Sequence, residues 1–235
     1  MADGLVHLQL HLLRVDDDGR HPGGTGVGRQ EGGGLLADPA GLALEPEPLD
    51  VLPAGLRARA SVRARVAAGL DAPVVEGGTL VGFLASRETA ALIGRDLGGS
   101  MRADSWGRMP LVRMTNLHLE PGAGSLEDLI SEVDDGILLC TNKSWSIDDK
   151  RLNFQFGTQI AWAIKRGKRG RMLRDATYTG VTPRFWGGLD AVAGVEEWQL
   201  HGLTNCGKGQ PGQHAHVSHG TAPARFRDVQ VGVGR

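Results

Sequence analysis

One cysteine in a glycine-rich segment is the feature of this sequence best suited to chemistry. Cys206 lies within residues 204–213, a stretch that contains three glycines. Glycine lets the backbone approach a bound ion or peptide closely. Lys208, two residues after Cys206, is a cation that favours the thiolate form of cysteine, which binds metals or attacks carbon. The segment therefore suits a metal ligand or a nucleophile, although it also fits an inert cysteine in a loop.

Three histidines follow this cysteine closely. His214, His216 and His219 fall within six residues, and imidazoles often bind zinc together with a thiolate. His216 and His219 are therefore candidates to join Cys206 in a metal site. The same spacing fits solvated histidines in a polar loop or strand, and the spacing alone favours this second interpretation.

Two further groups of residues have the types that a metal site or a nucleic-acid site needs. His7 and His11 are four residues apart, but Leu8 stands where a His-Glu-x-x-His peptidase motif needs its glutamate, and the local pattern is not helical. Six of the residues 165–174 are basic. Because no aromatic residues interleave with them and the net charge of the chain is −1, a solvated hairpin turn is favoured over a nucleic-acid site.

The elements that must position these residues are mostly strands. A hairpin is predicted between residues 74 and 84, around Gly77-Gly78. Alternating or short apolar runs predict further strands over residues 5–12, 109–119, 137–140, 152–156, 160–164, 172–173, 198–200 and 226–233. Strands in runs with few helices indicate an α+β fold, mainly antiparallel β-sheet with a few short helices.

Short helices are predicted at four places. Ser86 suits an N-cap of a helix that stops at Gly94, and Ser125 suits the N-cap of a helix that ends at Gly136. In the second of these, Leu126, Leu129, Ile130 and Val133 share one face. Weaker patterns predict a basic helix over residues 56–68 and a helix over residues 185–192, which Gly187-Gly188 weaken.

The first part of the chain has an unusual composition. Residues 1–80 contain no Phe, Trp, Tyr, Ile, Lys, Asn or Cys. Aromatic side chains dominate core energetics, so a segment without them has little to offset its ordering entropy. We expect residues 1–72 to be a poorly structured segment, or an out-of-frame reading of GC-rich DNA, and residues 73–235 to form the folded domain.

Composition also limits the cellular compartment and the kinds of partner that we expect. Two cysteines are too few for a disulfide framework, which favours a reducing compartment. The sequence has no apolar run of about 18–20 residues and no signal-peptide pattern. We therefore expect a cytoplasmic protein that binds neither membrane nor nucleic acid.

Several segments, read in order, resemble the TldD/PmbA family of zinc metallopeptidases. They are residues 81–91, 102–106, 110–117 with Pro121-Gly122, and 205–210, and residues 143–157 resemble the actinobacterial TldD branch. The resemblance implies extensive antiparallel sheet, cytoplasmic location, a homodimer or a heterodimer with a sister subunit, and zinc-dependent cleavage of peptides. It also implies that a cysteine of the C-terminal glycine-rich loop binds zinc, a position that Cys206 occupies here.

The sequence departs from the family at the other zinc ligands. In the family these are two histidines of a His-Glu-x-x-x-His helix whose glutamate is the general base, and no His-Glu pair occurs in this chain. We therefore expect the C-terminal part of a peptidase that does not cleave peptides by itself or retain zinc alone. The alternative is a non-catalytic scaffold subunit of a TldD/PmbA-type heterodimer.

Overall fold

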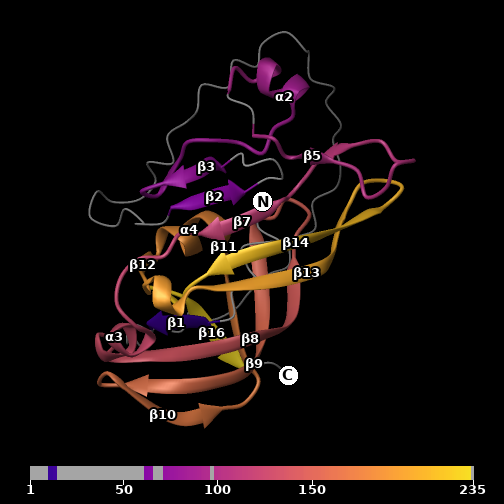
Figure 1. Cartoon of the computed structure of the whole chain (residues 1–235). Coiled ribbons are helices and arrows are strands. Elements are labelled where there is room, and N and C mark those ends of the chain that lie inside the picture. Colours follow the sequence, from indigo (N-terminus) through magenta and orange to yellow (C-terminus); the bar gives the residue numbers. More distant parts are fainter. Residues whose placement is uncertain (1–9, 15–60, 66–70, 96–97, 234–235) are drawn as a thin grey trace, which may run out of the picture.

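The computed structural model describes residues 10–14, 61–65, 71–95 and 98–233 (Figure 1). Its largest part is an eight-stranded sheet in the order β12-β15-β1-β8-β9-β11-β16, with β10 paired to β9. Neighbouring strands in this sheet are antiparallel, except that β1 runs parallel to β15. Its strands are β1 (Leu10–Arg14), β8 (Asp135–Ile147), β9 (Asn153–Lys165), β10 (Lys168–Leu173), β11 (Ala176–Val181), β12 (Leu189–Val192), β15 (Ala224–Phe226) and β16 (Gln230–Val233).

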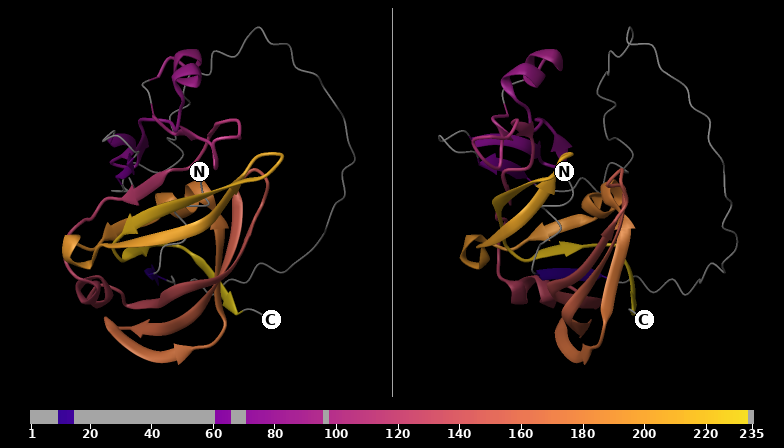
Figure 2. Two further views of the ribbon diagram at one scale, coloured as in Figure 1. Left: turned by 45° about the vertical axis from the view of Figure 1, so that its right-hand side comes forward. Right: turned by 90° about the vertical axis from the view of Figure 1, so that its right-hand side faces the viewer.

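Three smaller sheets complete the described strands. One has four strands in the order β4-β3-β2-β7, and the other two are the pairs β5–β6 and β13–β14. The strands are β2 (Val62–Arg65), β3 (Asp71–Glu76), β4 (Thr79–Leu80), β5 (Met101–Arg102), β6 (Leu111–Val112), β7 (Asn116–Leu119), β13 (Gln199–Lys208) and β14 (Gln213–Thr221). Figures 1 and 2 show β13 and β14 as a long ribbon beside the main sheet. The predicted α+β fold, mainly antiparallel, is confirmed.

The first predicted hairpin is confirmed at its turn, although its second strand ends at Leu80 rather than reaching residue 84. Glu76 pairs with Thr79, so Gly77 and Gly78 alone form the turn between β3 and β4. Their φ angles are 55° and 82°, in the left-handed region that a two-residue hairpin turn requires and that glycine adopts without steric cost.

The two helices predicted from N-cap serines are also present. They are α2 (Arg87–Leu92) and α3 (Leu126–Ser131), and both begin with a capping box. In α3, Leu129 and Ile130 are buried, as the apolar face predicted. The helix ends at Ser131 rather than at Gly136, because β8 begins at Asp135 and pairs with β9.

Two helix predictions are corrected. The helix expected over residues 185–192 is α4 (Thr182–Gly187), which ends at the glycine pair; the residues after it form β12, which pairs with β15. A single 3-10 turn, η1 (Val195–Glu197), follows. The basic helix expected over residues 56–68 is wrong for residues 62–65, which form β2 between β3 and β7. Sheet pairing on both sides outweighs the weak local preference of this segment.

Most of the segment expected to be poorly structured, residues 1–72, lies outside the described residues. The strand expected over residues 5–12 is described only from Leu10, where β1 begins. His7 lies outside the described part, and His11 belongs to β1. A metal pair of His7 and His11 therefore lies partly outside the described residues.

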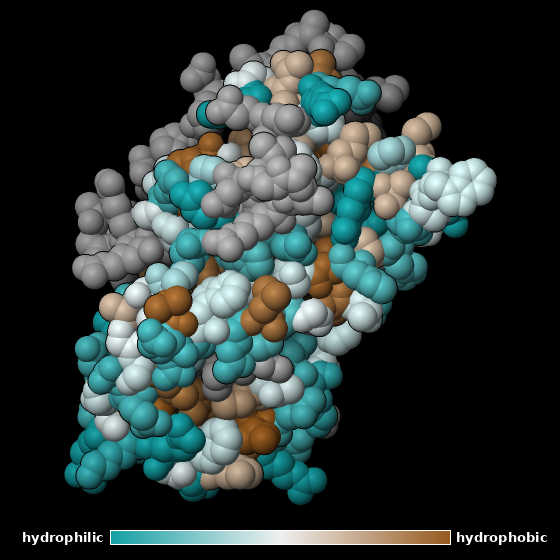
Figure 3. All heavy atoms as spheres, viewed as in Figure 1, coloured by the Kyte–Doolittle hydropathy of each residue, from teal (hydrophilic) through white to brown (hydrophobic). Residues whose placement is uncertain are grey.

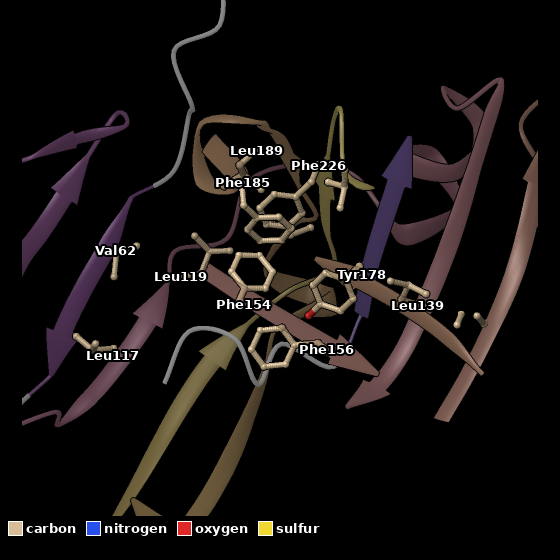
Figure 4. Close-up of a cluster of buried hydrophobic side chains, with 14 of the residues drawn as sticks. Val62, Leu117, Leu119, Leu139, Phe154, Phe156, Tyr178, Phe185, Leu189 and Phe226 are labelled. Carbon is tan, nitrogen blue, oxygen red and sulfur yellow. The ribbon is translucent and has the colours of Figure 1, made fainter. Parts of the chain in front are cut away.

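Aromatic rings fill the larger of two buried clusters (Figure 4). Phe185 and Phe226 stack with their ring centroids 4.1 Å apart, and Phe154 meets the edge of Phe185 at 5.1 Å. Phe156 stacks on Tyr178 at 5.5 Å. These rings come from β9, β11, α4 and β15, so the aromatic content after residue 80 builds this core.

The surface mixes polar and apolar residues. On the face shown in Figure 3, apolar residues lie in separate small groups among polar ones. None of the helices in the described ranges is long and apolar enough to cross a membrane.

Candidate functional site

A β-bulge determines which way Cys206 faces on the β13–β14 ribbon. Leu203 pairs with Val217, and Cys206 pairs with Ala215, so two residues of β13 oppose one residue of β14 between these pairs. Directly paired residues point to the same face of a sheet, and Val217 and Ala215 are two residues apart. Cys206 and Leu203 therefore share a face, which a regular strand would not allow for residues three apart.

A pocket of about 450 Å³ opens beside Cys206. It lies between β13 and the end of the β8–β9 hairpin, and Trp145, Phe156 and Leu203 contribute to its wall. Phe156 is 1% exposed and Trp145 is 59% exposed, so the wall runs from the buried core to the surface. Ser146, Arg151 and Asn205 add polar groups to the same wall. A concave site of this volume, with both apolar and polar walls and a thiol, can hold a small ligand or a peptide side chain.

The backbone at Cys206 is held by the segment that carries β5 and β6. The Nη2 atom of Arg113 donates a hydrogen bond of 2.5 Å to the carbonyl oxygen of Cys206. Two residues further along the ribbon, the ammonium group of Lys208 donates to the carbonyl oxygen of Val112. The ribbon and the segment of β5 and β6 therefore each donate a side-chain hydrogen bond to the backbone of the other.

The opposite strand of the ribbon is held by the same segment. The amide of Gln213, a buried residue, donates to the carbonyl oxygen of Met109 at 2.8 Å and accepts from the backbone N–H of Asp104 at 3.1 Å. Arg102 donates to the carbonyl oxygen of His216. The tip of the ribbon is therefore fixed on both strands by side chain to backbone hydrogen bonds.

The structure places His214 and His216 on the other face of the ribbon from Cys206. Both histidines are exposed and alternate with the buried Ala215, which pairs with Cys206. Since alternate residues of a strand point to opposite faces, these two imidazoles and the thiol point in opposite directions.

His219 lies on the same face as Ala215 but farther along β14. It is four residues from the partner of Cys206, which at the rise of a strand is roughly 13 Å. The ring is buried, with Nδ1 at 3.1 Å from the carbonyl oxygen of Leu117. Cys206, His216 and His219 are therefore not brought together.

Zinc, which the resemblance implies, finds one suitable donor here. Within the ranges that the structure describes, no three His, Cys, Asp or Glu residues form a group that could hold a metal, whereas zinc takes at least three protein ligands. The other thiol, Cys140, lies on β8 outside the pocket wall, and burial raises its pKa. The described residues thus do not form a complete zinc site by themselves.

The basic turn between β9 and β10 is partly neutralised. Lys165 forms an ion pair with Asp135, and Arg169 forms one with Glu127 at 3.0 Å. The guanidinium of Arg169 also lies over the ring of Trp162, 5.4 Å from its centroid. The pairing of Lys168 with Lys165 confirms that this turn closes a hairpin.

Arg113 and Trp145 were not singled out as site residues from the sequence. Arginine is seldom fully buried, so composition gives no sign that Arg113 lies beneath the backbone of Cys206 in β13. Arg113 lies within residues 110–117 and Trp145 within residues 143–157, two of the segments that resemble the family. That resemblance was the available signal, and it gave no role to either side chain.

Comparison with known proteins identifies relatives of this chain. A metalloprotease of Methanothermobacter thermautotrophicus is 31% identical over 159 residues, which cover 68% of this chain and 34% of that protein. A TldD homologue described as a metalloprotease, from Haemophilus influenzae, is 29% identical, covering 68% and 32%. A zinc metalloprotease TldD homologue of Saccharolobus solfataricus is 24% identical, covering 70% and 36%. The chain spans about a third of the length of these relatives.

The fold agrees with these matches. The crystal structure of TldE from Thermococcus kodakarensis superposes with a TM-score of 0.56 at 16% identity, covering 75% of this chain and 40% of that one. Residues 68–233 match the family described as PmbA/TldA metallopeptidase, C-terminal domain. The chain therefore belongs to the TldD/PmbA metallopeptidase family, through the C-terminal domain of that family.

Proposed function

We propose that this chain forms the C-terminal part of a zinc-dependent metallopeptidase that acts on peptides, with Cys206 as one zinc ligand. The observation that carries this proposal is the position of Cys206, which lies in the wall of a pocket on a ribbon tip fixed by hydrogen bonds. Zinc bound in such an enzyme activates water and polarises the scissile carbonyl group. Cys206 would supply a thiolate, and the pocket would hold a side chain of the peptide.

The chain by itself is proposed to be inactive. No His-Glu pair occurs in the sequence, so the two histidines and the general base of the family motif must come from elsewhere. Another copy of the chain lacks the His-Glu pair as well, so a homodimer would not supply these groups. A heterodimer with a TldD/PmbA-type subunit that contains the motif would supply them, and both assemblies are proposed. The proposed location is the cytoplasm, because both cysteines are free thiols and a reducing compartment keeps them so.

Zinc analysis and peptide hydrolysis test this proposal. The purified chain is incubated with zinc, freed of excess metal, and assayed for metal content and for hydrolysis with and without a chelator. We expect less than stoichiometric zinc and no chelator-sensitive hydrolysis. Stoichiometric zinc with chelator-sensitive hydrolysis by the chain alone would contradict the proposed inactivity.

A second assay tests the role of Cys206. The chain is co-expressed with a fragment of a TldD-type relative that contains the His-Glu-x-x-x-His helix. We expect zinc binding and hydrolysis in the mixture, both lost with Cys206→Ser and retained with Cys140→Ser, since Cys140 lies outside the pocket wall.

A scaffold subunit is the second candidate function, and the missing His-Glu pair favours it. A scaffold would raise the activity of a sister subunit without contributing a side chain that binds its zinc. In the same mixture, activity that depends on the chain but is unchanged by Cys206→Ser would identify the scaffold and exclude Cys206 as a ligand.

A further inference from the structure

The guanidinium of Arg113 is buried directly beneath the backbone of Cys206. The side chain is 2% exposed, and its Nη2 atom donates to the carbonyl oxygen of Cys206 at 2.5 Å. Residues 113 and 206 are 93 positions apart, so this contact joins two segments that nothing local in the sequence brings together.

The environment of this cation is unusual. Its Nε and Nη1 atoms are buried and have no hydrogen-bond partner among the described residues. Burial of a cation without full hydrogen bonding is costly, and an arginine used only as packing would be better replaced by an apolar residue. Among the residues that the structure describes, this guanidinium makes one hydrogen bond, to the residue that carries the candidate ligand.

The backbone of Arg113 is itself held firmly. Its N–H donates to the carbonyl oxygen of Ser100 at 2.9 Å, and the N–H of Ser100 donates to the carbonyl oxygen of Ala85 at 3.1 Å. Ser100 is fully buried, and its hydroxyl donates to the carbonyl oxygen of Gly98 at 2.9 Å. The guanidinium therefore projects from a fixed point, as a group that positions another residue must.

We propose that Arg113 is a positioning residue that fixes the backbone of Cys206, and through it the direction of the Cys206 thiol at the pocket wall. The importance of this for catalysis rests on the proposed function, in which the thiol is a zinc ligand. The positioning itself is a property of the chain without metal, so it can be tested without zinc or activity.

The two cysteines of the chain make a direct test possible. Protein labelled with ¹³C at the cysteine carbonyl gives two carbonyl signals, from Cys206 and Cys140, and Cys206→Ser assigns them. We expect Arg113→Met to move the Cys206 carbonyl signal and to speed alkylation of the Cys206 thiol about tenfold, because a lost hydrogen bond to a charged group shifts local opening by this order. The signal and alkylation rate of Cys140 stay unchanged. In Arg113→Lys, the carbonyl signal and the alkylation rate of Cys206 lie between those of the wild type and those of Arg113→Met.

Arg102 is the matched control, because it makes the equivalent contact to the carbonyl oxygen of His216 on the other strand. Arg102→Met is expected to leave the Cys206 signal unchanged and its alkylation rate within about twofold of the wild type. Wild-type values for Arg113→Met, or equal effects of Arg102→Met, would overturn the proposal. If Arg113→Met does not fold, Arg113→Gln is measured in the same way.

The outcome is separable from that of the proposed function. A changed Cys206 signal in Arg113→Met, together with zinc binding in the mixture that survives Cys206→Ser, would leave the positioning in place and reject the zinc ligand. An unchanged signal, together with zinc binding that needs Cys206, would reject the positioning by Arg113 and keep Cys206 as a zinc ligand.

Discussion

The indole ring of Trp198 lies against the backbone of Gly220, so closely that a Cβ atom on Gly220 would be 1.7 Å from Cζ2 of the ring. The indole N–H donates to the carbonyl oxygen of Leu119 at 3.1 Å, and the ring contacts the ring of His118, with centroids 5.6 Å apart. Trp198 therefore joins the ribbon to β7 in a position that only glycine at 220 permits.

Gly220→Ala is expected to destabilise the protein by about 3 kcal/mol, because the indole must leave its place or the strands must separate. Gly202→Ala is the control on the same ribbon, since a Cβ there meets nothing within 4 Å, and its effect should stay within about 1 kcal/mol. Urea denaturation measures both variants. Equal midpoints for the two would show that the contact with Trp198 is not a constraint.

A buried arginine of β15 ties β12 and α3 together. Arg225 donates to Asp190 at 2.9 Å and to Glu132 at 2.8 Å. The side chain of Asp190 is 15% exposed and that of Glu132 is 66% exposed. The two carboxylates therefore bind the same guanidinium in very different surroundings.

Asp190→Asn should cost about 3 kcal/mol of unfolding free energy, because it removes the negative charge that pairs with the buried cation of Arg225 and with Arg227. Glu132→Gln should cost less than about 1 kcal/mol, because solvent screens its ion pair. Thermal or urea unfolding of both variants at neutral pH tests the order, and a larger loss for Glu132→Gln would contradict it.

Local sequence signals predicted the elements whose determinants are near in sequence. Ser125 and Asp128 lie three residues apart, and their reciprocal hydrogen bonds begin α3. Gly77 and Gly78 likewise contain the whole turn between β3 and β4. In both cases the residues that make the structure are neighbours, so a short window of sequence was enough.

Features set by distant contacts were not predicted. β2 is a strand because it pairs with β7, more than fifty residues later. The direction of Cys206 depends on a bulge that exists only relative to β14, and the burial of His219 depends on its contact with Leu117 in β7. Such properties arise from pairing across the chain, for which residue spacing contains no information.

Stability at alkaline pH should depend on Tyr178, the single tyrosine of the chain. Burial raises the pKa of its hydroxyl far above the ordinary value. In the unfolded chain this group ionises near pH ~10, whereas in the folded protein it stays neutral, so the unfolded state is favoured as pH rises beyond that value. The stabilising contribution is full below pH ~10 and is lost above it.

Two measurements check this expectation. Tyrosinate absorbance of the native protein should appear only as the chain unfolds, and Tyr178→Phe should flatten the fall of stability between about pH 10 and 11. Tyrosinate absorbance near pH ~10 in protein that is still folded would mean that the hydroxyl is accessible to solvent.

The last prediction concerns the pocket beside Cys206. Trp145 lines this pocket and is 59% exposed, whereas Trp106 is fully exposed and is not part of the wall. If the pocket receives an apolar side chain of a peptide, Trp145→Ala should weaken binding of a phenylalanine-containing peptide about tenfold, because an aromatic contact surface is removed. Trp106→Ala should leave the affinity unchanged.

Fluorescence anisotropy with a labelled peptide measures both affinities. The same peptide with serine in place of phenylalanine distinguishes binding in the pocket from nonspecific binding of the peptide. Its affinity should be low for the wild type and unaffected by Trp145→Ala. Equal weakening of both peptides, or equal effects of the two tryptophan variants, would mean that the ring of Trp145 does not select a side chain. A loss confined to the phenylalanine peptide would place the apolar side chain in the pocket beside Cys206.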